Sequence, residues 1–260
     1  MKRGKMKPLS DLGLHQMGKH FQKTYIEQQC KELIKILDAS FEITECNVPI
    51  RENKFMLNVD ESHGVEKPRR WEYILERAIW RQFNKQSQSD EFLPGKCSWI
   101  RSFQVPLRRI QSDPSKAIDL LGVARDSFPV VIELKTDKSK ESPLRALVEA
   151  VAYGIALRKN WNSPEKSKFR EEWNFGLPSD ACPCPGKLKK ITLICIAPSD
   201  YWSNWKWESD SNLNIRKAMG DLILRLSQKG FNSYFAKFEY SGRKNPEIKS
   251  ASIFFPPNKE

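Results

Sequence analysis

The sequence predicts an α/β fold in which a mixed central sheet is flanked by helices, with additions at the N-terminal and C-terminal ends. Helix-like and strand-like patterns follow one another between residues 70 and 197 in the order helix, three strands, helix, strand. Residues 189–197 (KKITLICIA) are apolar on both faces, which is typical of a strand at the centre of a covered sheet. The 260 residues are enough for one large domain or two small ones.

We expect residues 1–65 to form an N-terminal extension and residues 66–260 to form the main α/β domain. The polar segment 60–70 contains a glycine and a proline and is the best candidate for a linker between them. Within the extension, residues 19–38 show the broad apolar stripe of a helix, and residues 40–59 contain two short strand-like runs that suit a hairpin.

The first helix of the main domain is expected over residues 70–86, where apolar residues recur at three- and four-residue steps. A strand follows at 98–109, and Pro106 indicates that this strand lies at an edge or ends early. A helix is expected over 143–159, with Ser142 as its N-cap residue. The remaining expected elements are a long polar insertion, a helix and two closing strands, at residues 160–188, 211–229, 231–240 and 252–256.

Composition narrows the class of protein. Lysine and arginine total 44 against 32 acidic residues, which gives a net charge of +12 and favours a polyanionic partner such as nucleic acid. The three histidines argue against a histidine-based zinc hydrolase and against a Ser-His-Asp triad. The six cysteines contain no CxxC pair for a structural zinc site, so reduced thiols are expected.

Targeting signals are not visible in this sequence. The basic residues at the start are not followed by the apolar segment of a signal peptide. No run reaches the roughly 18 apolar residues that a membrane span needs. We therefore expect a cytoplasmic protein with no membrane partner.

A predicted hairpin over residues 116–135 carries the most informative residues, Asp119, Glu133 and Lys135. Side chains alternate between the two faces of a strand, so Glu133 and Lys135 share a face. A three-residue turn centred on Asp126 would place Asp119 directly opposite Glu133. Facing residues on one side of a ladder lie roughly 4.5–5.5 Å apart at Cβ.

Two carboxylates at that distance repel each other, and a divalent cation with oxygen ligands is the usual remedy. Asp119 also interrupts an apolar run, and a charged side chain within such a run is normally paired or metal-bound. The alternative is a surface hairpin in which Glu133 and Lys135 form an ordinary solvated salt bridge.

These residues resemble the PD-(D/E)XK nuclease superfamily, whose enzymes have a restriction-endonuclease-like fold. The resemblance covers about residues 70–200 and implies a helix–strand–strand–strand–helix–strand core. The proline that precedes the motif aspartate in this superfamily is replaced by Ile118. Glu149 and Tyr153 lie four residues apart on the next helix, where the RecB-like branch has a glutamine and a tyrosine.

Phosphodiester hydrolysis needs an attacking hydroxide and neutralisation of charge at the phosphoryl oxygens. Mg²⁺ or Mn²⁺ held by Asp119, Glu133 and the backbone carbonyl of Leu134 would meet both needs. Lys135 would orient the attacking water or offset developing negative charge. Glu76, on the helix of residues 70–86, is a candidate for one more metal-ligating carboxylate, although a plain surface glutamate is the favoured interpretation.

Arg145, Glu149 and Tyr153 are expected to form a polar ridge on one face of the helix over residues 143–159. In one interpretation this ridge covers the metal site or contacts phosphates, and both Glu149 and Tyr153 belong to the catalytic set. In the other, Arg145 and Glu149 form a surface ion pair while Tyr153 caps the core. The sequence does not decide between these two interpretations.

Further contacts to nucleic acid are open to prediction. The aromatic segment at 201–210 would either stack unpaired bases or, as the favoured interpretation, pack against the core. Candidate phosphate contacts are Arg101, Arg108, Arg109, Lys138 and Lys140.

The sequence thus predicts a magnesium-dependent deoxyribonuclease, with an endonuclease favoured over an exonuclease. A silent nucleic-acid-binding module on a nuclease-like scaffold is the first alternative. A protein-interaction module within a larger defence or repair complex is the second. A homodimer is a further option, since cleavage of both strands of a duplex often needs two such sites.

Overall fold

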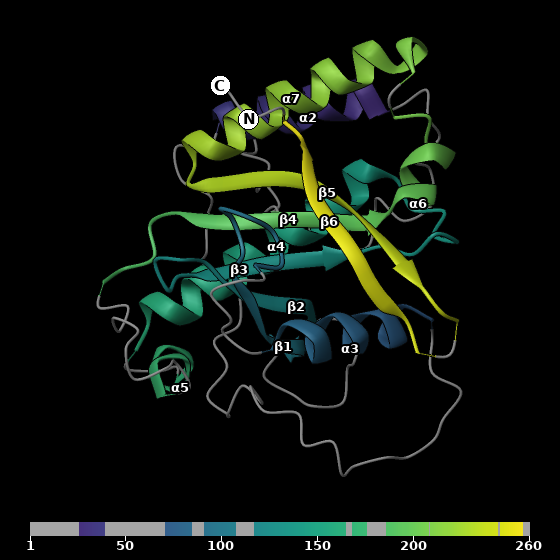
Figure 1. The fold of residues 1–260 in the computed structure, drawn as a ribbon. Coiled ribbons are helices and arrows are strands. Elements are labelled where there is room, and N and C mark those ends of the chain that lie inside the picture. Colours follow the sequence, from purple (N-terminus) through teal and green to yellow (C-terminus); the bar gives the residue numbers. More distant parts are fainter. Residues whose placement is uncertain are drawn as a thin grey trace.

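A six-stranded mixed sheet forms the centre of the molecule (Figure 1). The computed structural model describes residues 26–39, 71–84, 91–107, 117–164, 168–175, 186–207, 209–243 and 245–256. The strands lie side by side in chain order: β1 (Trp99–Pro106), β2 (Ala117–Val123), β3 (Pro129–Leu134), β4 (Ile191–Pro198), β5 (Phe231–Ser241) and β6 (Glu247–Phe255). Parallel pairing joins β3 to β4 and β4 to β5, and the other neighbours are antiparallel. The predicted mixed α/β sheet is confirmed.

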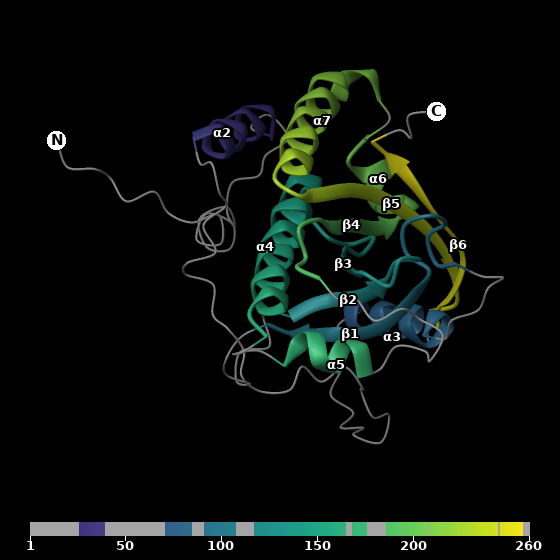
Figure 2. The same ribbon diagram turned by 90° about the vertical axis from the view of Figure 1, so that its left-hand side faces the viewer.

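Helices cover both faces of this sheet (Figure 2). One face carries α4 (Pro143–Asn162), α7 (Leu213–Gln228) and α2 (Ile26–Ala39), whose apolar residues join one hydrophobic cluster. The other face carries α3 (Trp71–Phe83), which belongs to a second cluster. The remaining short helices are α5 (Phe169–Phe175), α6 (Ser199–Asn204) and the 3-10 turn η3 (Asp210–Asn212).

The element order from α3 to β4 is the expected helix, three strands, helix, strand, with the short helix α5 added between α4 and β4. Strand β4 is central, and it is buried on both faces. Leu193 and Cys195 pack into the cluster under α4, while Ile194 and Ile196 pack into the cluster under α3. Strand β1 is an edge strand that ends at Pro106, in agreement with the prediction for this proline.

The turn between β2 and β3 has the predicted length and centre. The N–H of Ala124 donates to the carbonyl of Phe128 at 2.9 Å, which leaves three residues in the loop with Asp126 in the middle. Ser127 takes the left-handed conformation with φ 63°, as the last position of a three-residue hairpin loop often does. The pairing register of the hairpin follows from this turn.

Helix α4 begins where the sequence predicts. The Ser142 hydroxyl accepts the N–H of Arg145 at 3.1 Å, and Pro143 occupies the first turn. A side chain at Gly154 would meet Leu193 of β4 at 2.8 Å. The glycine therefore lets this helix approach the sheet closely, next to Tyr153.

Two predicted segments differ from the structure. The insertion at 160–188 contains the last turn of α4 and the helix α5, where Trp161, Phe169 and Trp173 pack together in the core. These buried aromatic residues give the segment a structure that its polar composition concealed. The last strand starts before residue 252, because polar residues that alternate with apolar ones extend β6 back to Glu247.

The described part of the N-terminal extension is α2, which packs against α7. Cys30 approaches the sulfur of Met219 at 3.4 Å, and Leu33 and Leu37 are buried in the same cluster as the sheet. The expected hairpin at 40–59 and linker at 60–70 lie outside the described residues.

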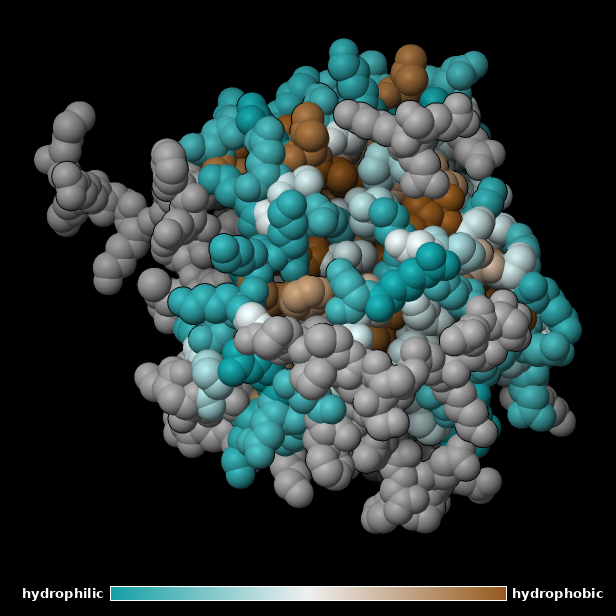
Figure 3. Space-filling view, turned by 60° about the vertical axis from the view of Figure 1, so that its left-hand side comes forward, coloured by the Kyte–Doolittle hydropathy of each residue, from teal (hydrophilic) through white to brown (hydrophobic). Residues whose placement is uncertain are grey.

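The surface is mainly hydrophilic on the face drawn in Figure 3, where small hydrophobic groups are surrounded by polar residues. Among the helices that the structure describes, none is long and apolar enough to cross a membrane. The cysteines within the described ranges, Cys30, Cys97 and Cys195, are free and buried.

Candidate metal and catalytic site

Strand β2 separates from β3 at Asp119. The ladder between them ends at the pair Leu120–Ile132, one residue before the predicted pair of Asp119 and Glu133. The same register continued by one step places these two acids opposite each other. Asp119 Oδ2 instead accepts the backbone N–H of Leu134 at 2.9 Å, so a carboxylate takes the place of a carbonyl at the end of the ladder.

The two acids are held in an environment that opposes their charge. Glu133 is only 3% exposed, and Asp119 is partly buried. Burial and then the charge of Asp119 raise the pKa of Glu133 well above its usual value. Burial and then the charge of Glu76 raise the pKa of Asp119 in the same direction. For each acid, a neighbouring carboxylate adds to the effect of burial.

Lys135 lies among three carboxylates. Its Nζ is 2.8 Å from Glu133 Oε1, 2.8 Å from Glu149 Oε2 and 2.5 Å from Glu141 Oε2. Burial lowers the pKa of this lysine, but the charges of Glu133, Glu149 and Glu141 outweigh burial and raise the pKa well above its usual value. Lys135 is thus a fixed cation at neutral pH, and it is buried, which excludes the solvated surface salt bridge.

Glu149 and Tyr153 face the same group of charges. Glu149 accepts from Lys135, and from Arg145 Nε at 2.7 Å. Burial acts against the charge of Glu149, yet the cations Lys135 and Arg145 hold its pKa below the usual value. Burial and then the charges of Glu133 and Asp119 raise the pKa of Tyr153. The Arg145–Glu149 pair is therefore an inward-facing contact and not a surface ion pair.

Glu76 is buried, so the favoured interpretation of it as a plain surface glutamate is wrong. Its side chain is 1% exposed, and Oε2 accepts the side-chain amide of Gln104 at 2.6 Å. Burial raises the pKa of Glu76 to about 8 despite that hydrogen bond, and the charge of Glu133 adds to the effect. We call Glu76, Asp119 and Glu133 the acidic cluster. The charges of these residues raise one another's pKa values, although the residues come from three different elements.

Gln104 is a site residue that the sequence analysis missed. In the β1–β2 register, Phe103 pairs with Leu120 and Val105 pairs with Ile118, so Gln104 lies across from Asp119. Its backbone has φ 52°, a conformation that is uncommon for residues other than glycine. Such outliers cost on the order of 1–3 kcal/mol and cluster at functional sites. The strained backbone places the amide on Glu76.

Glu141 was also missed, because it lies in a charged turn that resembles an ordinary solvated loop. It is about half exposed, with a relative side-chain accessibility of 47%, yet its carboxylate reaches Lys135. The hydroxyl of Tyr201 donates to the backbone carbonyl of Glu141 at 2.8 Å. The aromatic segment thus anchors the loop that closes over Lys135.

One carboxylate oxygen of the acidic cluster is left without a hydrogen bond. Glu133 Oε1 binds Lys135, whereas Oε2 is buried and has no hydrogen-bond partner among the described residues. A buried carboxylate oxygen without a partner is costly. In an extended strand the N–H and C=O of one residue point to the same side. The Leu134 N–H bonds to Asp119, so the Leu134 carbonyl also points toward the β2 side of the strand.

Among the described residues, no group of three or more Asp, Glu, His or Cys side chains is arranged as a cage that could hold a metal ion. Mg²⁺ does not require such a cage. It commonly keeps several waters and uses one or two carboxylates together with substrate phosphates. Asp119, Glu133 and the Leu134 carbonyl fit that pattern, with Glu76 close enough to act on the charge of the cluster.

The predicted contacts to nucleic acid divide into two groups. Arg101 is not available to phosphates: its side chain is 8% exposed, its guanidinium lies 4.9 Å from the ring centroid of Trp173, and it donates to the carbonyl of Glu172 at 3.0 Å. Lys138 and Lys140 are exposed after β3. The other two candidates, Arg108 and Arg109, lie outside the described residues.

The aromatic segment at 201–210 packs against the core, as the favoured interpretation states. Trp202 is 5% exposed, donates to the carbonyl of Ala236 at 3.1 Å and contacts Phe235 and Phe254 edge-on or tilted. Trp207 is also buried. These rings are therefore unavailable for stacking on bases.

Comparisons of the chain with protein-family models, with curated proteins and with solved structures found no match. The interpretation of the site depends on its own geometry and on the resemblance in its motif.

Proposed function

We propose that this protein is a metal-dependent nuclease that hydrolyses phosphodiester bonds of DNA. Asp119, Glu133 and the carbonyl of Leu134 would hold Mg²⁺ or Mn²⁺ at the end of β3. The observation that carries the proposal is the unpartnered Glu133 Oε2, buried beside a second carboxylate and a fixed ammonium group. Neither a solvated hairpin nor an apolar core accounts for that combination.

A hard cation bound there would lower the pKa of a coordinated water and neutralise charge on the phosphate. Lys135 remains protonated, so it supplies hydrogen bonds and positive charge to the attacking water or a phosphoryl oxygen, and it does not accept a proton. Glu149 and Arg145 fix the position of this ammonium group. Tyr153 supplies a neutral hydroxyl to the same space.

Support for a nucleic-acid substrate comes from the net charge of +12, since cations release the counterions of a phosphate backbone. The preference for DNA over RNA follows from the resemblance to the nuclease superfamily. Endonuclease action is favoured over exonuclease action on the same ground. Cleavage of different DNA and RNA substrates tests both preferences.

The test is incubation with supercoiled plasmid, linear duplex, single-stranded DNA and single-stranded RNA, in Mg²⁺, Mn²⁺ or EDTA. We expect the plasmid to be nicked or linearised with either metal, with no product in EDTA. Asp119→Asn should be inactive. Asp126→Asn is the matched control, because Asp126 is an exposed carboxylate in the turn of the same hairpin.

Equal cleavage by the wild type and Asp119→Asn would show that the activity belongs to another site or to a contaminant. Salt-sensitive DNA binding without products in either metal would instead support the silent binding module. Absence of both cleavage and binding would support a protein-interaction module.

A further inference from the structure

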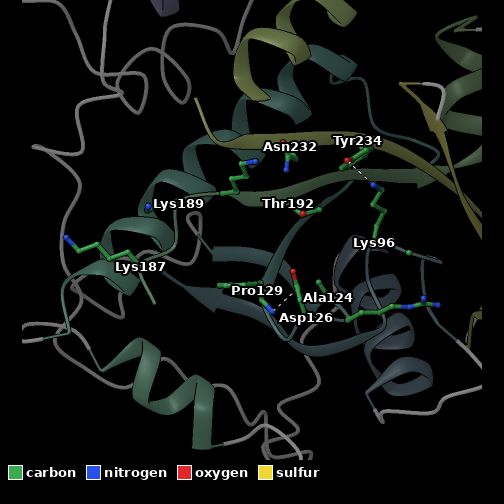
Figure 4. A pocket seen from close by; sticks show the side chains of 13 residues that line it. Lys96, Ala124, Asp126, Pro129, Lys187, Lys189, Thr192, Asn232 and Tyr234 are labelled. Carbon is green, nitrogen blue, oxygen red and sulfur yellow. Dashed lines mark hydrogen bonds between the residues drawn. The ribbon is translucent and has the colours of Figure 1, made fainter. Parts of the chain in front are cut away.

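A cavity of about 600 Å³ lies at the end of the sheet opposite the acidic cluster, and its size is within the range of small-molecule sites. The first residues of β4 and β5 line it, together with the β2–β3 turn and the loop that carries Lys96 (Figure 4). Pro129, at the start of β3, is part of this lining, whereas Glu133 is near the end of the same strand.

The cavity and Glu133 lie on opposite faces of the sheet. Side chains alternate between the two faces of β5, so Tyr234 lies on the same face as Ala236. Ala236 packs in the cluster under α3, so this is the α3 face of the sheet. Val131, two residues before Glu133 on β3, packs in the cluster under α4. Glu133 therefore faces α4, on the opposite side of the sheet from Tyr234.

The lining also carries Arg125, which is paired with Glu91, and one carboxylate, Asp126, but four lysines give the cavity a net positive charge: Lys96, Lys187, Lys189 and Lys190. None of them forms an ion pair with a carboxylate in the part of the chain that the structure describes. Figure 4 shows Lys187 and Lys189 on one side of the opening and Lys96 on the other. Like charges gathered in this way repel one another, and a polyanion removes that cost.

The wall formed by β4, β5 and the β2–β3 turn has a different character. Lys96 donates to the Tyr234 hydroxyl at 3.0 Å and lies 4.3 Å from its ring centroid (Figure 4). Asn232 Oδ1 accepts the hydroxyl of Ser227 at 2.9 Å, which orients the amide so that its N–H groups are left as donors. Phe128 and Thr192 complete this wall. An aromatic ring beside an amide donor suits a flat, polar group.

We infer that this lysine-lined cavity binds a nucleoside polyphosphate. Lys187, Lys189 and Lys190 would contact the phosphate chain through charge-assisted hydrogen bonds. The base would contact Asn232 and Tyr234, whose ring already holds Lys96. The size of the cavity favours one nucleotide over a longer strand. This site is independent of the proposed nuclease activity, because it shares no residue with the acidic cluster.

The experiment is isothermal titration calorimetry on the full chain in EDTA at about 150 mM salt, where weak surface attraction is largely screened. ATP, tripolyphosphate and a short single-stranded oligonucleotide are the titrants. We expect saturable binding of ATP that is tighter than binding of tripolyphosphate. In Lys189→Ala/Lys190→Ala the ATP affinity should fall by about tenfold or more, because charge-assisted contacts are lost.

Lys35→Ala/Lys217→Ala is the matched control, since it removes the same charge from exposed helical positions far from this cavity in the sequence and should leave ATP binding unchanged. Asp119→Asn should also bind ATP normally. The inference is overturned if ATP does not bind, if the two double variants bind it equally, or if tripolyphosphate binds as tightly as ATP. Binding of the oligonucleotide in preference to ATP would assign the cavity to a nucleic-acid strand and overturn it as well.

Discussion

Asp119 Oδ2 accepts the backbone N–H of Leu134 at 2.9 Å and thereby ends the ladder between β2 and β3. In a continued antiparallel ladder this N–H would bond to a main-chain carbonyl of β2. The carboxylate thus has a structural task and a charge that its surroundings oppose. Substitutions at Asp119 can remove its charge with or without removing its hydrogen bond to Leu134.

We predict that Asp119→Asn retains the hydrogen bond to Leu134, whereas Asp119→Ala leaves that N–H without a partner. A buried donor without a partner costs about 1–3 kcal/mol, so the asparagine variant should be more stable than the alanine variant by that amount. Both should be inactive. Urea denaturation together with the cleavage assay measures the two effects, and equal unfolding free energies would contradict the structural task of Asp119.

Lys135→Met should be strongly destabilising. It leaves Glu133 and Glu149 buried without their shared cation, and breaking a buried ion pair from one side costs about 3–5 kcal/mol. Adding Glu133→Gln should recover part of that loss, because Lys135 is the one cation paired with Glu133 among the described residues, whereas Glu149 keeps Arg145. Denaturant unfolding of the single and double variants gives the comparison. A change below about 1 kcal/mol for Lys135→Met would mean that its ion pairs resemble those of a solvated surface.

Glu141 and Glu149, which both bind Lys135, should contribute differently to the free energy of unfolding. Glu141 has a relative side-chain accessibility of 47% and Glu149 of 9%, and exposed ion pairs contribute about 0–1 kcal/mol. Glu141→Gln should therefore change the unfolding free energy little, while Glu149→Gln should cost more because Arg145 also loses its partner. A larger loss of stability for Glu141→Gln than for Glu149→Gln would contradict this ranking.

The raised pKa of Glu76 predicts how the stability of the metal-free protein depends on pH. Its pKa is raised from 4.5 to about 8 in the folded protein, so the folded state binds more protons than the unfolded state between these values. The contribution of Glu76 is fully present below pH 4.5 and is lost as the pH rises through about 8. Thermal unfolding in EDTA should show the fall for the wild type and a smaller fall for Glu76→Gln. Equal slopes would show that Glu76 ionises normally.

The hairpin and its motif could be predicted because local rules determine them. Alternation along the chain sets the faces of β2 and β3, and a three-residue turn sets their register. The three-residue turn centred on Asp126 was enough to predict the register of the hairpin, although the observed ladder ends at Leu120–Ile132, one pair before Asp119 and Glu133. The buried run of β4 similarly identified the centre of the sheet.

The remaining site residues depend on tertiary packing. Glu76 lies on a helix whose pattern does not show how closely it approaches β2, and Gln104 reaches it only through an unusual backbone conformation. Glu141 belongs to a turn whose charges resemble a solvated loop. Helix α5 lies in a segment that proline and glycine made look irregular, although Phe169 and Trp173 are buried.

The central claim is that one hard cation binds between Asp119 and Glu133. Crystals of the protein soaked in Mn²⁺ test it directly through the anomalous scattering of manganese. The account predicts one strong peak at about 2.1 Å from an oxygen of each carboxylate, and no such peak in crystals of Asp119→Asn. A manganese peak elsewhere with none between these acids, under conditions that support cleavage, would contradict the account.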